Sequence, residues 1–229
     1  MSHHDDFQTE PVPGLPAHLP EGEAIVWQGR PDAAAIARHV LHRNKVAIYF
    51  AALVAWRVMS GLYDGLPIAV ILGNAAWALV LAATAILIIT VIAYGMARTT
   101  VYTITNKRVV MRIGVALPVT FNLPFAQILS ADLARLSGGS GTIALTLKEH
   151  TKISWAVLWP HARPWKLAKP QPALRCLPDV VPVANLLADN LRQAHGGNGN
   201  VTPVSSKSED AKPVRSREAS VGTLQPEGA

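Results

Sequence analysis

The chain has 229 residues, half of them hydrophobic, a formal net charge of +6 and a sequence pI near 9.7. Once two long apolar stretches are set aside, the remainder suffices for only one ordinary domain. The single cysteine, Cys176, excludes an internal disulfide and a cysteine-rich zinc site. No motif that reads nucleic-acid grooves accompanies the basic excess, so we expect no nucleic-acid partner and assign the charge to a negative membrane surface.

Residues 1–37 contain no basic segment leading into a short apolar core, so we expect a cytoplasmic N-terminal segment without a cleavable signal. Two apolar stretches follow: residues 46–63 carry only Arg57 as a charged interruption, and residues 65–97 contain no charged residue and no histidine. A membrane-spanning helix needs about 20 predominantly apolar residues. The pattern therefore predicts a helical hairpin over 38–98, with spans at about 39–60 and 70–97. We expect Arg57 to extend its charge to the membrane surface.

Lysine and arginine flank both outer ends of this hairpin, whereas the short connecting turn is nearly free of them. The positive-inside rule then predicts that both termini are cytoplasmic. The basic residues before the first span are Arg30, Arg38, Arg43 and Lys45, and those after the second are Arg98, Lys107, Arg108 and Arg112. Small residues in the spans predict close packing of the two helices and leave a homodimer possible; they are Gly73, Ala76, Ala83, Gly95, Ala51, Ala52 and Ala55.

The sequence after the spans changes to a β-strand pattern. Two runs rich in Val, Ile, Thr and Tyr within 99–113 are separated by Asn106 and Lys107, which predicts a hairpin. Further strands are expected at 116–122, 128–133, 142–147 and 152–156. This spacing favours an antiparallel sandwich or a small barrel over 99–195.

A helix is expected at the end of this domain. Asp179 can cap it, Pro182 fits its first turn, and Gly196 and Gly197 end it; an apolar face is formed by Val183, Leu186, Leu187 and Leu191. The tail over 196–229 is rich in Gly, Ser, Pro and mixed charge, so we expect it to be disordered.

The region 155–175 is the candidate docking surface, because Trp and Arg dominate binding hot spots and its prolines limit the entropy lost on binding. Its candidate residues are Trp159, His161, Arg163, Trp165 and Arg175. The alternative is that Trp155 and Trp159 fill the core, Trp165 covers an apolar rim, and His161 and Arg163 are solvated. A second candidate surface is the cationic hairpin formed by Lys107, Arg108 and Arg112, which either contacts membrane lipid or is simply solvated.

No hydrolase, metalloprotease, nucleotide-binding or dinucleotide-binding motif is present, so we expect no enzymatic activity and no metal site. Neither apolar stretch, 46–63 or 65–97, contains a histidine that could hold a pigment. His39 and His42, at the cytoplasmic entrance of the first span, are expected to be interfacial residues rather than ligands. We therefore expect no bound cofactor and a colourless protein.

Residues 98–128, RTTVYTITNKRVVMRIGVALPVTFNLPFAQI, resemble the opening of bacterial pleckstrin-homology-like domains, in which a Y-x-I-T-N-x-R hairpin follows membrane spans. Together with the PxGExIxWQGxP pattern at 20–31, LWPHARPW at 158–165 and LRCLP at 174–178, the chain is similar to the PuhB family of photosynthetic-complex assembly proteins, over roughly residues 5–195.

That resemblance implies a pleckstrin-homology-like barrel whose C-terminal helix plugs an open end. It also implies an accessory protein of the bacterial inner (intracytoplasmic) membrane, with reaction-centre and core-antenna subunits as its partners. The alternative is a general membrane-anchored protein of the same domain class with a lipid-binding or envelope-homeostasis role. Composition and periodicity alone fit both.

Overall fold

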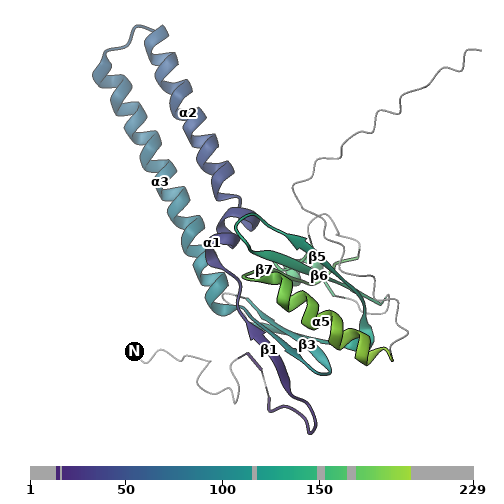
Figure 1. The fold of residues 1–229 in the computed structure, drawn as a ribbon. Helices are drawn as coiled ribbons and strands as arrows, with labels where there is room; N and C mark the ends of the chain where they lie inside the picture. The colour runs from purple at the N-terminus through teal and green to yellow at the C-terminus, as the bar shows by residue number, and fades with distance from the viewer. Residues whose placement is uncertain (1–13, 16, 115–117, 149–152, 164–168, 197–229) are drawn as a thin grey trace, which may run out of the picture.

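The computed structural model describes residues 14–15, 17–114, 118–148, 153–163 and 169–196. Two long antiparallel helices, α2 (Arg43–Tyr63) and α3 (Ile68–Thr99), form a helical hairpin that projects from a β-rich domain (Figure 1). Before the hairpin come β1 (Ile25–Gly29), the short helix α1 (Ala33–Ala35) and one π-helical turn, η1 (Ile36–Val40).

The elements after the hairpin build most of the β-rich domain. They are β2 (Val101–Thr105), β3 (Arg108–Ile113), β4 (Val119–Pro124), the 3-10 turn η2 (Phe125–Gln127), β5 (Ile128–Arg135), β6 (Gly141–Leu147), α4 (Trp155–Leu158), β7 (Ala173–Leu177) and α5 (Val180–Ala194). We call these elements together with β1 the β domain.

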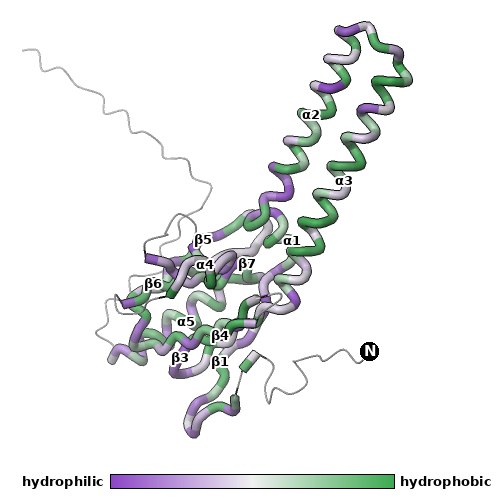
Figure 2. Tube along the Cα trace, turned by 180° about the vertical axis from the view of Figure 1, so that it is seen from behind, coloured by the Kyte–Doolittle hydropathy of each residue, from purple (hydrophilic) through white to green (hydrophobic). Residues whose placement is uncertain are grey.

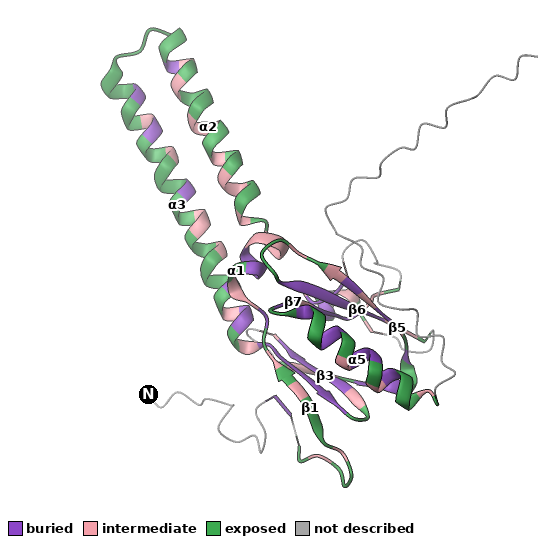
Figure 3. Ribbon diagram, in the orientation of Figure 1, coloured by how far each residue is buried: buried purple, intermediate pink, exposed green. Residues whose placement is uncertain are grey.

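Both hairpin helices are long and apolar enough to cross a membrane. In the most apolar 18-residue stretch of each helix, only 6% of α2 and 11% of α3 is buried inside the protein. These helices are therefore not the core of a globular fold. Apolar residues run along both helices in Figure 2, and Figure 3 shows most of these positions exposed. Soluble monomeric proteins rarely expose an apolar surface of this extent, so α2 and α3 are candidate membrane spans.

The helix boundaries differ slightly from those expected. The first long helix begins at Arg43 rather than near 39, because His42 adopts a left-handed conformation with φ 54° that separates it from η1. Histidine is among the residues enriched in that region. Ser60 and Gly61, expected in the turn, lie in the last turn of α2, and the connection is made by residues 64–67.

Close packing in the hairpin uses a different set of small residues from the one predicted. A Cβ added at Gly61 would lie 2.9 Å from Ile71 Cγ1, and Ala75 and Ala82 of α3 are also buried. The predicted positions lie mainly on the outer faces, because a shift of one residue turns a helical side chain by about 100°. Those that are exposed are Gly73, Ala76, Ala83, Ala51, Ala52 and Ala55.

The β domain contains two antiparallel sheets, with strand orders β1-β2-β3-β4 and β5-β6-β7. Of the expected arrangements, a sandwich or a small barrel, the closed barrel is wrong: in the described part of the chain the two sheets do not close into one. Helix α5 lies across the opening between them (Figure 1). It buries Val183, Leu187 and Leu191 in a core shared with both sheets. Asp179 stands at the start of α5, but its side chain forms no capping bond, because its backbone is left-handed with φ 48°.

Strand β1 precedes the helical hairpin in sequence and joins the first sheet beside β2, which follows it. Gln28 pairs with Thr103 and Gly29 with Tyr102, and the Gln28 side chain donates to Thr103 Oγ1 at 2.9 Å. The expected separation of residues 1–37 from the domain at 99–195 is incomplete, because β1, which lies in the first segment, belongs to the sheet of that domain. Both ends of the helical hairpin therefore return to one sheet.

Most of the remaining strand predictions are confirmed, and one is wrong. The hairpin at 99–113 and the strands at 128–133 and 142–147 are confirmed by β2, β3, β5 and β6. The strand expected at 116–122 is seen as β4, with residues 115–117 outside the described residues. The strand expected at 152–156 is wrong, since α4 starts at Trp155. The tail beyond Gly196 lies outside the described residues.

A helical elbow, formed by α1 and η1, fixes the β domain to the base of α3. Ala35, Ile36 and Ala37 pack against Ala93 and Met96 of α3, and buried Cys176 of β7 completes this small cluster. The Asp32 carboxylate caps α1 by accepting from Ala35 N at 2.9 Å, and Asp32 N donates to Cys176 O at 2.8 Å. His39 lies 3.2 Å from Ser137 Oγ on the β5–β6 turn, while His42 is exposed.

Candidate docking site

The candidate docking surface is built on a loop that the β domain holds firmly. We call residues 155–163, from α4 to Arg163, the docking loop. Its end bonds to the segment around β7: Ala173 N donates to His161 O at 2.8 Å, and Arg163 N donates to Gln171 O at 2.9 Å. Leu158, with 0% exposure, anchors its middle in the interior. These hydrogen bonds and the buried Leu158 side chain fix the docking loop in place on the β domain.

His161 is the buried residue of the docking loop that bonds to the rest of the domain. Its side chain is 3% exposed and lies 2.6 Å from the Tyr102 hydroxyl through Nδ1 and 3.4 Å from Thr100 Oγ1 through Nε2. The Tyr102 hydroxyl accepts a bond from Arg175 N at 3.3 Å, so its own hydrogen is available to Nδ1. In this arrangement His161 is neutral, with its proton on Nε2. Thr100 follows α3 directly, so the loop is tied to the base of that helix.

Burial explains the charge states of this pair. Desolvation, assisted by the positive charge of Arg175, lowers the pKa of His161 to about 3. Burial likewise raises the pKa of Tyr102 above its usual value. The pair is therefore neutral at physiological pH. The expectation of His161 as a surface contact, and the alternative of a solvated His161, both disagree with this position.

The two arginines of the candidate set also hold the loop in place. Arg175 is half-buried and donates through Nη1 to Pro160 O at 3.1 Å. Arg163 donates through Nη1 to Asp132 Oδ2 at 2.8 Å and to Gln171 Oε1 at 3.1 Å. The side chains of this ion pair are 37% exposed for Arg163 and 35% exposed for Asp132. The loop is thus clamped by side chains from β5 and from the residues before β7.

What the docking loop presents outward is apolar. Trp159 is 56% exposed and Val157 is 49% exposed. The alternative that Trp159 fills the core is therefore wrong, whereas Trp155 is half-buried. Trp165 lies outside the described residues. Sequence reasoning missed Val157 as a surface residue. It also missed Tyr102 and Asp132, which support the loop, because these two residues are distant from it in the chain.

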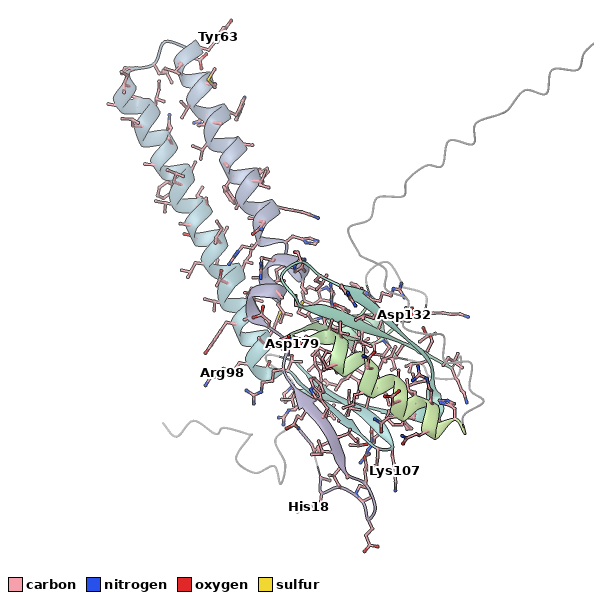
Figure 4. The ribbon with its side chains drawn as sticks, in the orientation of Figure 1. His18, Tyr63, Arg98, Lys107, Asp132 and Asp179 are labelled. Carbon is pink, nitrogen blue, oxygen red and sulfur yellow. The ribbon has the colours of Figure 1, made fainter. Side chains whose placement is uncertain are left out.

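The cationic hairpin does not form the expected membrane surface. Arg112 is 5% exposed, and Arg108 pairs with Glu23 at 2.7 Å. Lys107 alone of the three is exposed, at the β2–β3 turn, and Figure 4 shows it at the end of the β domain away from the helical hairpin.

The Glu23–Arg108 pair joins the segment before β1 to β3. Burial raises the pKa of Glu23, but hydrogen bonds from Arg108 and Thr105 and the nearby positive charges outweigh it, so the pKa lies below its usual value. The Glu23 side chain is only 3% exposed, which makes this a structural ion pair rather than a lipid contact.

No group of three or more His, Cys, Asp or Glu side chains that could hold a metal ion occurs among the described residues.

Comparison with known proteins gives a family and one informative relative. The family described as bacterial PH domain matches residues 49–191, from α2 into α5. The chain is 43% identical over 195 residues to an uncharacterized 23.7 kDa protein in the puhA 5′ region of Rhodobacter capsulatus, an alignment that covers 82% of this chain and 88% of the relative. No solved structure matches the chain. The match over more than half of its length shows that this chain belongs to the bacterial PH domain family.

Proposed function

We propose that this protein is a non-enzymatic assembly factor of the PuhB type, which helps to bring together subunits of the bacterial photosynthetic reaction centre and core light-harvesting complex. The observation that carries this proposal is the relative in Rhodobacter capsulatus, which is named for its position in the puhA 5′ region and is similar over most of both chains. The motifs that resemble the PuhB family lie at residues 20–31, 98–128, 158–165 and 174–178.

The proposed location is the bacterial inner membrane, with α2 and α3 crossing the bilayer. Pairing of β1 with β2 supports an even number of crossings, because these strands flank the hairpin and must lie on the same side. The excess of Lys and Arg at that side favours the cytoplasm for both termini. Reporter fusions at residues 1 and 229 test this orientation, and a periplasmic signal from either end contradicts it.

The proposed contacts with partner subunits combine the outer faces of α2 and α3 with the docking loop. Trp159 and Val157 are exposed apolar side chains on a loop held by hydrogen bonds, and tryptophan is the residue type most enriched in binding hot spots. Because the loop is already ordered, binding loses little conformational entropy.

Deletion of the gene, followed by absorbance spectra of isolated membranes, tests the assembly role. We expect selective loss of reaction-centre and core-antenna absorbance, restored by the wild-type gene. Trp159→Ala should restore it only partially while accumulating to normal protein levels. Val181→Ala, which removes an exposed apolar side chain of α5, serves as the control and should restore it fully. Normal pigment complexes with a defective envelope would instead support the general lipid-binding or envelope role.

A further inference from the structure

Three cations lie at the base of the helical hairpin, where the apolar helices meet the β domain. Arg43 and Lys45 belong to the first turn of α2, and Arg98 to the last turn of α3. Lys45 and Arg98 are exposed and Arg43 is half-exposed. We call these three residues the basal cations. Figure 4 shows Arg98 at the lower end of α3, at the opposite end of the hairpin from Tyr63.

The basal cations have no carboxylate partner among the described residues, in contrast to three arginines of the β domain. Ion pairs in the domain link Arg108 to Glu23 at 2.7 Å, Arg163 to Asp132 at 2.8 Å and Arg192 to Asp189 at 2.6 Å. The carboxylate of the adjoining elbow, Asp32, is already used to cap α1. Three positive charges therefore stand at the edge of an apolar surface without a described counter-charge.

Arg98 is held in a geometry suited to a membrane surface. Its Nη1 donates to the Tyr94 hydroxyl at 2.6 Å, and its guanidinium carbon lies 5.8 Å from the centre of the Tyr94 ring. Tyr94 is 56% exposed. Tyrosine is enriched where the hydrocarbon meets the headgroups. The remaining guanidinium N–H groups can donate in pairs to phosphate oxygens.

We propose that the basal cations bind the phosphate groups of anionic phospholipids in the cytoplasmic leaflet. Anionic lipids give that leaflet a negative potential that attracts basic residues beside a membrane helix. The cations of the β2–β3 hairpin do not share this role, since Arg108 is paired, Arg112 is buried and Lys107 lies far from the helices. The inference rests on the proposed insertion of α2 and α3 but is independent of the assembly role.

The test compares lipid retained by full-length protein. The protein is reconstituted in vesicles of equimolar phosphatidylglycerol and phosphatidylcholine and extracted in mild detergent, and bound lipid is quantified by mass spectrometry. We expect enrichment of phosphatidylglycerol. Each cation contributes roughly fivefold at most in relative affinity, so the triple variant R43Q/K45Q/R98Q should move the ratio toward one.

Two variants keep the result interpretable if the triple variant is unstable. R43K/R98K conserves charge but loses the paired donors, so it should retain more of the enrichment than the triple variant and less than the wild type. K107Q removes an exposed cation far from the helices and should leave the enrichment unchanged. Equal retention of both lipids by the wild type, or equal losses in K107Q and the triple variant, would overturn the proposal. So would loss of phosphatidylglycerol in excess inorganic phosphate but not in chloride of equal ionic strength, which would assign the cations to a free anion.

Resistance to alkaline carbonate extraction separates this inference from the insertion on which it rests. Wild-type protein that remains in the membrane but shows no lipid preference contradicts the lipid site alone. Protein released by carbonate contradicts insertion itself, and with it the lipid site.

Discussion

The buried pair of His161 and Tyr102 makes the stability of the β domain dependent on pH. In the unfolded chain His161 takes up a proton with the ordinary pKa of 6.5, whereas in the folded protein burial lowers its pKa to about 3. Between these values the unfolded state binds a proton that the folded state does not. The stability that His161 contributes is therefore complete above pH 6.5 and declines as the pH falls toward 3.

The size of this effect at pH 5 follows from the difference in proton binding. Uptake of a proton by a group of pKa 6.5 at pH 5 favours the unfolded chain by about 2 kcal/mol, and the folded-state pKa lies too low to offset it. We expect the free energy of unfolding to fall by this amount more between pH 8 and pH 5 in the wild type than in His161→Gln.

The assay is urea unfolding of the full-length protein in detergent, followed by the fluorescence of the tryptophans in the β domain. Tyr102→Phe is the matched control: it removes the hydroxyl that bonds to His161 but keeps the buried imidazole, so it should lower stability at every pH and preserve the slope. Identical pH dependence in the wild type and His161→Gln would refute the reasoning, because it would mean that His161 is already protonated or exposed in the folded protein.

Three further predictions concern packing and charge. Gly61→Val should force α2 from α3 and lower the thermal midpoint of helix loss measured by circular dichroism, whereas Gly73→Ala, where an added Cβ meets nothing within 4 Å, should not. Glu23→Gln should cost about 1.5–3 kcal/mol of unfolding free energy at neutral pH, and this effect should be lost in acid, where the wild-type carboxylate is itself protonated. The control is Asp189→Asn, which breaks the exposed ion pair with Arg192 and should cost less than about 0.5 kcal/mol. Leu187→Ala should cost about 2–5 kcal/mol in urea unfolding, because Leu187 is fully buried; a loss below 1 kcal/mol would contradict its core position.

Local patterns predicted the elements whose determinants lie close together in sequence. The β2–β3 hairpin was recognisable because both strands and the Asn106–Lys107 turn fall within fifteen residues, 99–113. The apolar length of α2 and α3 predicted two helices without knowledge of the rest of the fold. Boundaries were less accurate, since His42 ends the elbow through a backbone conformation that the apolar pattern does not contain.

Long-range pairing decided the features that sequence patterns missed. Strand β1 has five residues and pairs with β2 across the entire helical hairpin, so no local signal identifies its partner. His161 has the local context of an exposed proline-rich loop, and its burial depends on Tyr102, 59 residues away. Strand β7 lies between Pro172 and Pro178, which obscured it, although as an edge strand of its sheet it tolerates flanking prolines.

The placement of β1 ahead of the helices has a consequence for biosynthesis. The ribosome releases β1 first, but its hydrogen-bonding partner β2 emerges only after both helices have been made. A chain in which just one helix crossed the bilayer would leave β1 and the other three strands of its sheet in different compartments, and the four-stranded sheet could not form. With α2 and α3 inserted as proposed, correct insertion is thus a prerequisite for completing this sheet, and an incorrectly inserted chain exposes unfinished strand edges to proteolysis.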